Sequence, residues 1–426
     1  MAAPTVRRCW VLKERPTQEA QLSHFEFQEQ AFNADLAKGQ LLLKTLYLEP
    51  HPAMFGRIRS EANYTAGVQL GEVMHCGGIA QVVASKSSAF QPGDLVQGMV
   101  KMQDWQVADG KGWNKLNPIC TDPVEAMTLL GLNMVTAYFL LRDLGQPKPG
   151  QTLVVSAGAG HVGSLVGQMG RIAGCRTVAL CGSEEKVQMC LTEFGYDAAI
   201  NYKTYGNDRE ALTKAVESAC PKGVDIFFDN VSGDQPVALF PLFNLRARWI
   251  VCGRIALANL ANTMTGDIGP RDASLLIVKQ VVKLGGHVMP FLPRTMESVI
   301  HAAKWNKAGK LKAPADIRRG IEEAVPAQLS LLTGSHLGKV MVQVLEPEPL
   351  PKPASSMARM FRNLVESAWF PTDWYVFFLK CRAGHKGLYL GDAPANDTAI
   401  GSTAVVGAFT CILAGGIIGA FLSKRM

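Results

Sequence analysis

The sequence lacks the features that mark several common classes of protein. None of its 10 cysteines belongs to a C-x-x-C pair, and they follow no regular spacing. This argues against a zinc ribbon and for reduced thiols in a reducing compartment. The segment Met1–Trp10 holds no apolar run long enough for a secretory signal, so we expect the folded part to face the cytosol.

Long basic runs are also absent, although the net charge of +7 would suit a nucleic-acid partner. No run of Lys or Arg exceeds two residues, as at Arg7-Arg8 and Lys424-Arg425, and no nucleic-acid recognition module is recognisable. Scattered charge of this kind indicates a solvated basic surface. We expect no nucleic-acid partner.

What is present is the composition of an ordered globular protein, with 48% hydrophobic and 19% charged residues. Residues up to about 125 are mostly β-compatible, most clearly at Gln40–Leu48 and Ile79–Ala84. From Thr152 onward strands alternate with helices, which predicts a parallel sheet covered on both faces. The predicted strands are Thr152–Ser156, Arg176–Cys181, Val224–Asp229 and Trp249–Cys252, and a helix is expected over Glu184–Phe194.

A glycine-rich turn stands between the first of these strands and the next helix. The segment reads Thr152-Leu-Val-Val-Ser-Ala-Gly-Ala-Gly-His-Val-Gly-Ser164. We interpret Gly158 as permitting a tight turn, Gly160 as letting the backbone approach a pyrophosphate, and Gly163 as allowing close helix–strand packing. The N-terminus of the following helix would offer amide donors to phosphates. The pattern predicts a dinucleotide-binding site.

The end of the second strand indicates which dinucleotide is bound. Enzymes that use NAD usually place an acidic residue there, whereas this chain has Cys181-Gly182-Ser183. Small residues leave room for a 2′-phosphate, to which Ser183 and Lys186 can donate. Glu184 and Glu185 argue the other way unless they occupy the first turn of a helix, where acids favour the dipole. We therefore expect NADPH.

Together these residues resemble the zinc-free branch of the medium-chain dehydrogenase/reductases, the leukotriene/prostaglandin and alkenal double-bond reductases. The resemblance covers about residues 8–346. Its motifs are Tyr47-Leu-Glu-Pro-His-Pro-Ala-Met54, Leu70-Gly-Glu-Val-Met74, Gly131-Leu-Asn-Met-Val-Thr-Ala-Tyr138, Gln146-Pro-Lys-Pro-Gly-Gln151, Asn201-Tyr-Lys203, Asp229-Asn-Val-Ser-Gly233 and His336-Leu-Gly-Lys339.

The resemblance implies an α/β fold with a Rossmann doubly wound parallel sheet, a GroES-like β domain and, in most members, a homodimer. The implied domains are a GroES-like substrate domain (1–125), a Rossmann NADP-binding domain (126–297) and a return segment that completes the substrate domain (298–346). No metal is implied, because Leu70-Gly71-Glu72 stands where zinc relatives carry Gly-His-Glu and the four-cysteine lobe is missing.

Carried over position by position, the resemblance also implies a set of cofactor-binding residues. The pyrophosphate is placed on Gly160, His161, Val162 and Gly163, and the 2′-phosphate on Lys186 and Tyr202. Further implied contacts are Asn230 after the fourth strand, Cys252, Gly253 and Ile255 beside the nicotinamide, His287, Val288 and Met289 at its carboxamide, and His336 in place of an asparagine.

Two departures from the family bear on catalysis. The family usually has tyrosines where this chain has Ala53 and Ala258, so the hydroxyl that could polarise a substrate carbonyl is absent at both positions. Arg254, beside the implied nicotinamide site, is the candidate catalytic residue and could bind an anionic or carbonyl group. The alternative is that it is a surface arginine pointing away.

The composition changes after the last predicted globular strand. Residues 347–399 are read as a proline-rich linker, starting from Glu346–Pro353, followed by an amphipathic and aromatic segment. Ile400–Leu422 carries no charge and at about 1.5 Å per residue is long enough to span a hydrocarbon core of ~30 Å. We predict a transmembrane helix over 400–423 that anchors the chain by its tail, with the mitochondrial outer membrane favoured over the endoplasmic reticulum. The alternative is a buried core helix.

These expectations combine into an NADPH-dependent reductase of the C=C bond of α,β-unsaturated carbonyls, such as enones and alkenals, tethered to a membrane. The alternatives are a catalytically weak or inactive NADPH-binding protein that serves as a tethered sensor or scaffold, and a quinone reductase. The sequence does not identify the physiological substrate.

Overall fold

The computed structural model describes residues 4–59, 67–116, 122–258 and 272–348. All of them belong to one compact unit, Met1–Phe377. The predicted transmembrane helix at 400–423 and nearly all of the segment 347–399 lie outside the described residues. The predicted domain limits at residues 125, 297 and 346 stay predictions.

The cofactor half is built on a six-stranded parallel sheet in the order β10-β9-β8-β11-β12-β13. This is the strand order of a doubly wound dinucleotide-binding fold. The chain starts at β8 in the centre, adds β9 and β10 on one side, and then adds β11, β12 and β13 on the other. The strands are β8 (Thr152–Ser156), β9 (Arg176–Cys181), β10 (Ala198–Asn201), β11 (Val224–Asp229), β12 (Phe243–Val251) and β13 (Val282–Gly285).

Helices cover both faces of this sheet, as alternating side chains of β8 illustrate. Leu153 and Val155 join a core cluster with the helices on one face, whereas Val154 joins the cluster on the other. The first face is covered by α2 (Leu132–Phe139), α3 (His161–Ile172), α4 (Glu184–Thr192) and α8 (Thr295–Lys307), and the second by α5 (Arg209–Ala219), α6 (Gln235–Leu239) and α7 (Ala273–Val278).

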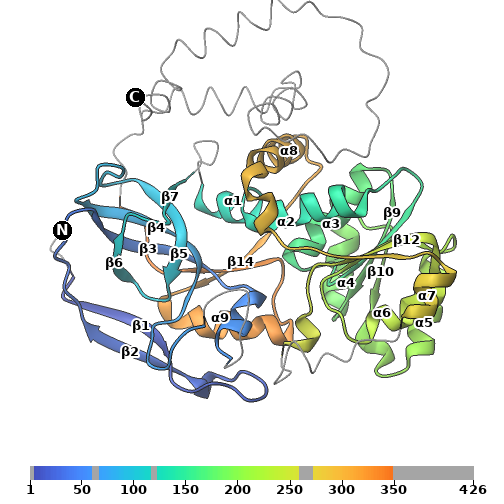
Figure 1. Cartoon of the computed structure of the whole chain (residues 1–426), viewed down its shortest axis with the longest axis horizontal. Helices are drawn as coiled ribbons and strands as arrows, with labels where there is room; N and C mark the ends of the chain where they lie inside the picture. The colour runs from blue at the N-terminus through green and yellow to red at the C-terminus, as the bar shows by residue number, and fades with distance from the viewer. Residues whose placement is uncertain (1–3, 60–66, 117–121, 259–271, 349–426) are drawn as a thin grey trace, which may run out of the picture. The chain divides into compact units, whose positions relative to one another are not determined.

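The second half is a seven-stranded sheet in the order β14-β15-β3-β4-β5-β7, with β6 also paired to β3. Its last two strands in sequence lie beside its first, so the chain returns to the N-terminal sheet after the Rossmann portion (Figure 1, orange beside blue). The strands are β3 (Gln40–Glu49), β4 (His75–Ser85), β5 (Leu95–Lys101), β6 (Trp105–Asp109), β7 (Asn114–Lys115), β14 (Ala315–Arg319) and β15 (Lys339–Gln343). Helix α9 (Ala324–Thr333) packs on this half, as does the hairpin of β1 (Val6–Leu12) and β2 (Phe25–Ala31).

One helical stretch of the described residues, Pro123–Gly145, is long and apolar enough to cross a membrane. It comprises α1 (Pro123–Thr128), α2 and the π-helical turn Leu140–Gly145. Two thirds of its most apolar window (67%) is buried in the fold, and Met134, Val135 and Phe139 belong to the core cluster of the Rossmann half. Its hydrophobicity is therefore explained by the core that it fills.

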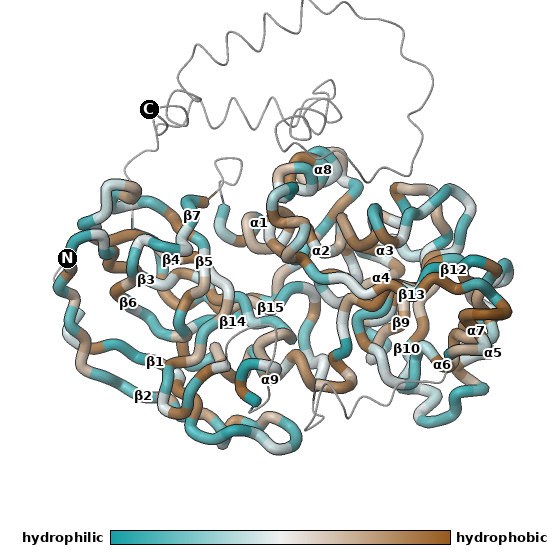
Figure 2. Tube along the Cα trace, viewed as in Figure 1, coloured by the Kyte–Doolittle hydropathy of each residue, from teal (hydrophilic) through white to brown (hydrophobic). Residues whose placement is uncertain are grey.

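The edge of the Rossmann sheet carries an apolar surface. Ile277 and Val278 on α7 are 77% and 70% exposed, and Leu245 on β12 is 62% exposed. Figure 2 shows α7 as a brown segment beside β12 and β13. Single exposed apolar residues are ordinary, but three at one sheet edge form a candidate contact surface. We refer to Leu245, Ile277 and Val278 as the edge patch.

The predicted fold class is confirmed for the α/β Rossmann sheet with a GroES-like partner, and local differences have physical causes. Strands β8, β9 and β11 have the predicted limits. Helix α4 ends at Thr192, two residues early, because Phe194 turns into the core and Gly195 adopts φ 67°. Strand β12 begins six residues before Trp249, and β13 was not predicted. The short β13 contains the exposed residues Lys283 and Gly285, so it has no apolar run from which a strand could be predicted.

Candidate cofactor and active site

The glycine turn between β8 and α3 leaves no room for side chains at two of its glycines. A Cβ on Gly163 would lie 2.2 Å from the carbonyl oxygen of Ala157, and one on Gly158 would lie 2.5 Å from the Cβ of Ala179. The left-handed residue of the turn is Ala157, with φ 49°. Gly158 is therefore required by packing against β9 and not, as its position predicted, by the conformation of the turn.

The turn fits a dinucleotide pyrophosphate. Gly160 is the N-cap of the 12-residue helix α3, with extended backbone angles. The amides of His161, Val162 and Gly163 form the first turn of α3, where N–H groups have no partner within the helix and the dipole favours an anion. An isolated bridge between Gly160 and Gly338 also brings the return segment beside this turn.

The side chain of His161 points into the protein. It is buried, and its Nδ1 lies 2.9 Å from Nδ2 of Asn133 on α2. Burial lowers the pKa of His161 well below its ordinary value, and the charge of Lys339 acts in the same direction. The ring is therefore neutral and gives no charge to a phosphate, so only the backbone of His161 remains for that role.

At the end of β9, several polar side chains gather where the sequence predicted the 2′-phosphate. Ser183 is the N-cap of α4 and accepts a hydrogen bond from the amide of Lys186 at 3.3 Å. Glu184 and Glu185 occupy the first turn of α4, as the NADPH prediction required. The Nζ of Lys186 donates to the carbonyl oxygen of Gly334 in the return segment at 2.6 Å.

Gly182 has no side chain and therefore leaves space in this corner. A Cβ on it would lie 3.4 Å from the Tyr202 hydroxyl and 3.3 Å from Cε of Lys203. The pKa of Lys186 is lowered, first by burial, and the positive charge of Lys203 contributes to this shift. Bringing an anion between two lysines would relieve this repulsion. Lys203 is a candidate that the sequence analysis placed in a motif without giving it a role.

His336 reaches the same corner from the return segment. Its Nδ1 lies 3.3 Å from the carbonyl oxygen of Ser330 at the end of α9. Its pKa is lowered to about 4, mainly by burial, and Lys186 is the largest charged contributor. The ring is therefore neutral at physiological pH, so His336 contributes a polar but uncharged group to this corner.

The carboxyl ends of β8, β11 and β12 are joined by a buried hydrogen-bond network around Asp229. Its carboxylate accepts from Ser156 Oγ at 3.0 Å and from Trp249 Nε1 at 3.2 Å. Asn230 Nδ2 donates to the carbonyl oxygen of Ser156 at 2.8 Å. The predicted cofactor residue Asn230 thus also ties β11 to β8.

The predicted nicotinamide loop follows β12. The amides of Cys252 and Gly253 donate to the Asp229 carbonyl oxygen at 2.8 and 3.0 Å. A Cβ on Gly253 would lie 2.7 Å from the Asn230 carbonyl oxygen, so only glycine fits there. Burial raises the pKa of Cys252 to about 12. At neutral pH its sulfur is a thiol and not a nucleophilic thiolate.

This loop meets the β domain. Ile255 and Ala258 pack against a core cluster that includes Met54 and Phe55. Arg59, which the sequence analysis missed, is buried and its Nη2 donates to the Ala258 carbonyl oxygen at 3.2 Å. The wall facing the loop is therefore largely apolar.

The remaining residues predicted near the nicotinamide lie on two different segments, one after β12 and one after β13. Arg254 is the N-cap of the short 3₁₀ helix Ile255–Leu257 and is partly exposed. His287 and Met289 lie on the surface after β13, with the Met289 amide donating to His287 Nδ1 at 3.3 Å. Val288 packs partly against the Rossmann core.

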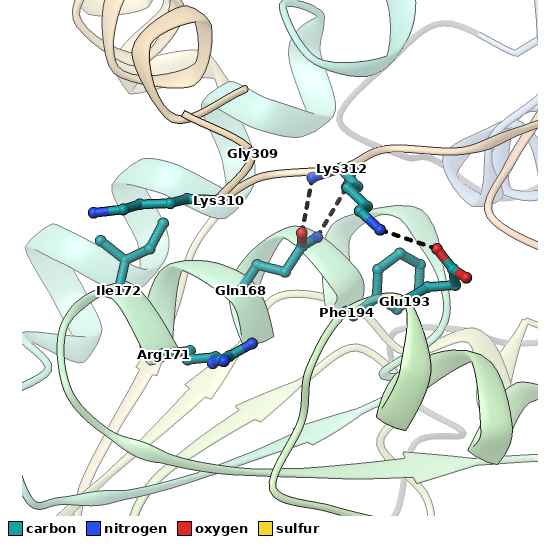
Figure 3. Close-up of a pocket in the computed structure, with 8 residues that line it drawn as sticks. All are labelled: Gln168, Arg171, Ile172, Glu193, Phe194, Gly309, Lys310 and Lys312. Carbon is teal, nitrogen blue, oxygen red and sulfur yellow. Dashed lines mark hydrogen bonds and ion pairs between the residues drawn. The ribbon is translucent and has the colours of Figure 1, made fainter. Parts of the chain in front are cut away.

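A separate cavity of about 380 Å³ lies at the opposite end of α3 (Figure 3). Gln168 closes one side by bonding the backbone amide and carbonyl of Lys312 at 2.8 Å each, and Lys312 pairs with Glu193 at 3.2 Å. The cavity is lined by Gln168, Arg171, Ile172, Glu193, Phe194, Gly309, Lys310 and Lys312. Since 12 helical residues span about 18 Å, it is distinct from the glycine turn. Its basic groups lie beside the carboxyl ends of α3 and α8, whose dipoles they offset.

Comparisons with known proteins agree with this geometry. Residues 8–116 match the family described as N-terminal domain of oxidoreductase, and residues 162–264 match the family described as zinc-binding dehydrogenase. The NADPH-dependent curcumin reductase of Escherichia coli is 34% identical over 339 residues, which are 79% of this chain and 96% of that protein. This chain belongs to the zinc-free, NADP-dependent medium-chain dehydrogenase/reductases.

Two further comparisons concern this reductase's cofactor and fold. The NADP-dependent 2-alkenal reductase of Nicotiana tabacum is 32% identical, over 81% of this chain and 99% of that one. The crystal structure of CurA from Vibrio vulnificus in complex with NADPH has a TM-score of 0.73 and 33% identity, covering 80% of this chain and all (100%) of that one. The reductase is an NADP-dependent oxidoreductase, as predicted. Within the described ranges, no three His, Cys, Asp or Glu side chains are grouped so that they could hold a metal.

Proposed function

We propose that this enzyme reduces the C=C bond of α,β-unsaturated carbonyl compounds with NADPH. When bound, NADPH would supply the hydride for the β-carbon, and solvent would supply the proton for the α-carbon. The observation that carries the proposal is the apolar wall formed by the core cluster that includes Met54 and Phe55, against which Ile255 and Ala258 of the predicted nicotinamide loop pack. Such a wall favours a conjugated apolar substrate and holds it against the cofactor.

The state of Cys252 supports the same substrate class. Enones alkylate thiolates, so an exposed thiolate beside the nicotinamide would be consumed by the substrate. The pKa of Cys252 is raised to about 12 by burial, and at pH 7 only about one sulfur in 10⁵ would carry the charge. Relatives named as curcumin and 2-alkenal reductases are consistent with this class.

The chain departs from its family at Ala53 and Ala258, and this departure favours one alternative function, that of an NADPH-binding sensor or scaffold. With no tyrosine hydroxyl at either position, the protein would bind NADPH but turn over slowly or not at all, as a sensor or scaffold. Arg254 is the candidate residue that could polarise the substrate carbonyl in place of the missing tyrosine hydroxyls. We place it in this role because it caps the turn between Cys252 and Ile255.

A substrate panel tests the proposal. NADPH oxidation by the purified full-length chain is followed with a medium-length alkenal, an aryl enone, a quinone and no acceptor. Our expectation is turnover of the alkenal or enone with recovery of the saturated carbonyl product by mass spectrometry. Turnover of the quinone alone would replace the proposal with a quinone reductase. Tight NADPH binding without any turnover would replace it with the sensor or scaffold.

We further propose that the enzyme is a tail-anchored membrane protein of the mitochondrial outer membrane, with its catalytic part in the cytosol. The uncharged run Ile400–Leu422 and the basic end Lys424-Arg425 support this. Alkaline carbonate extraction of cells that express the full chain and a version truncated before residue 400 is the test. Retention of the full chain alone in the membrane pellet is expected, and release of both would rule out the anchor.

A homodimer is our third proposal, and the edge patch is its candidate surface. Ile277, Val278 and Leu245 stand at the side where β13 ends the sheet. A second copy that covers this edge would bury the apolar side chains and the free backbone groups of β13 together.

A further inference from the structure

Two cysteines that are separate in sequence meet beside the cofactor corner. Cys181 is the last residue of β9 and Cys190 lies in the last turns of α4. Their sulfur atoms are 3.4 Å apart, and the two residues are 1% and 0% exposed. A disulfide bond has an S–S distance of about 2.05 Å, so the sulfurs need to approach by only about 1.4 Å.

The sulfur of Cys181 lies in surroundings that favour a thiolate. Hydrogen bonding with Cys190 lowers the pKa of Cys181, and the amides of Ala159 and Gly158 and the charge of Lys186 contribute in the same direction, against burial. The pKa of Cys190 is raised, first by this hydrogen bond. These opposite directions favour Cys181 as the nucleophile and Cys190 as the thiol that keeps its proton.

The segment between the two cysteines contains the predicted 2′-phosphate site. Gly182, the N-cap Ser183 and Lys186 all lie between Cys181 and Cys190. Lys186 is four residues before Cys190 on α4, and so on the same side of that helix. A bond between the sulfurs closes a short ring around the groups that distinguish NADPH from NADH.

We propose that Cys181 and Cys190 are a redox modification site that hydrogen peroxide or a similarly small hydroperoxide converts to a disulfide, and that this disulfide weakens NADPH binding. The Cys181 sulfur attacks one peroxide oxygen, the O–O bond breaks, and a sulfenic acid and water form. The Cys190 sulfur then attacks the sulfenic sulfur, the S–S bond forms, and the second oxygen leaves as water with the Cys190 proton. Two thiols are oxidised and one peroxide is reduced, so the atoms and electrons balance.

Closing this bond brings the Cys181 and Cys190 sulfurs about 1.4 Å closer and pulls α4 toward the end of β9. That displacement moves Ser183 and Lys186, whose contacts with each other and with Gly334 hold the corner in place. A change of this size is enough to lose well-directed hydrogen bonds. NADH has no 2′-phosphate, so its binding depends less on these residues. The inference rests on NADP binding and not on the substrate proposed above.

The test uses the full-length chain, reduced and then treated with hydrogen peroxide. Differential alkylation and peptide mapping identify the linked cysteines, and the quenching of protein fluorescence measures binding of NADPH and NADH. The expected result is a Cys181–Cys190 cross-link and an NADPH dissociation constant at least ten times higher, both reversed by dithiothreitol, with little change for NADH. Absence of this cross-link, or an NADPH affinity that the cross-link leaves unchanged, would overturn the proposal.

Two variants identify the cause of the loss. Cys190→Ala removes the second thiol, and its NADPH binding is expected to resist the peroxide dose that weakens the wild type. Cys220→Ala removes another buried cysteine, at the end of α5, and is expected to stay as sensitive as the wild type. Equal sensitivity of Cys190→Ala and the wild type would assign the effect to another residue. The wild-type peptide map and its reversal decide the proposal even where a variant folds poorly.

Discussion

The ammonium group of Lys186 donates to the carbonyl oxygen of Gly334 at 2.6 Å, across 148 residues of sequence. The bond joins the first turn of α4 in the Rossmann half to the end of α9 in the return segment. The group that the sequence assigns to the 2′-phosphate is therefore held in place by the other half of the enzyme, and we expect phosphate recognition to depend on how the two halves meet.

Replacing Lys186 should separate the two nicotinamide cofactors. Lys186→Met removes one charged hydrogen bond to the 2′-phosphate, worth roughly 1.5–3 kcal/mol, or roughly 10- to 150-fold in the NADPH dissociation constant. NADH binding should change little. Titration calorimetry with both cofactors measures this, with Lys214→Met on the exposed face of α5 as the control. An equal loss for both cofactors would mean that Lys186 does not contact the phosphate.

Restoring a hydroxyl beside the nicotinamide loop should speed the proposed reaction. Ala258→Tyr is expected to raise the rate of enone reduction by up to roughly a hundredfold, the value of about one oxyanion donor. NADPH affinity should stay within a factor of about two. Ala258→Phe is the matched control, because it adds the ring without the hydroxyl. A similar rate in both variants would show that bulk, and not the hydroxyl, changes the activity.

Acid should destabilise the protein through His51, a partly buried histidine. Burial lowers the pKa of His51 to about 4, from an ordinary value of 6.5. The unfolded state binds the proton first, so this stability is present above pH 6.5 and is lost as the pH falls below it. Between pH 7.5 and pH 5 the loss from His51 is about 2 kcal/mol. Urea unfolding at both pH values measures it, and His51→Gln should reduce the difference by about that amount; an unchanged difference would contradict the assignment.

A charge in the edge patch should dissociate the proposed dimer. Ile277→Glu places a carboxylate at a position that is 77% exposed in the single chain, so the fold should tolerate it while a covered interface should not. Sedimentation analysis of the part of the chain before residue 350 is expected to show a dimer for the wild type and a monomer for the variant. Met99→Glu, on the exposed side of β5, is the control and should remain a dimer. A dimer in both would place the interface elsewhere.

The sequence predicts best what depends on neighbours in the chain. Strands β8, β9 and β11 are recognisable because both faces are buried, which gives continuous apolar runs bounded by turn residues. The first-turn acids Glu184 and Glu185 also follow local rules and take the predicted places, and Ser183 before them is the N-cap, a role that was not assigned to it from the sequence.

Contacts across the fold were not predictable in the same way. Gly158 was assigned to the conformation of the turn, but the reason for glycine there is Ala179 on the next strand. Nothing in the spacing of Cys181 and Cys190 indicates that they touch, because the contact depends on how the turn at Gly182 and Ser183 folds α4 back against the end of β9. Arg59 and Lys203 reach the site only through tertiary packing. Local patterns carry no information on which distant surface a side chain meets.

The pairing of β15 with β3 has a consequence for how the enzyme is made. Leu48 has one of its two strand partners at Val342, so the end of β3 is completed only after nearly the whole described chain has left the ribosome. The strands of the Rossmann sheet all lie between Thr152 and Gly285 and can pair earlier. Until Lys339–Gln343 emerges, β3 is paired to β4 and, over Gln40–Lys44, to β6, but the part of its edge at Tyr47 and Leu48 lacks its final partner and is open to incorrect association. A pause in synthesis after Gly285 and before Lys339 should therefore leave an incompletely folded protein exposed to chaperones.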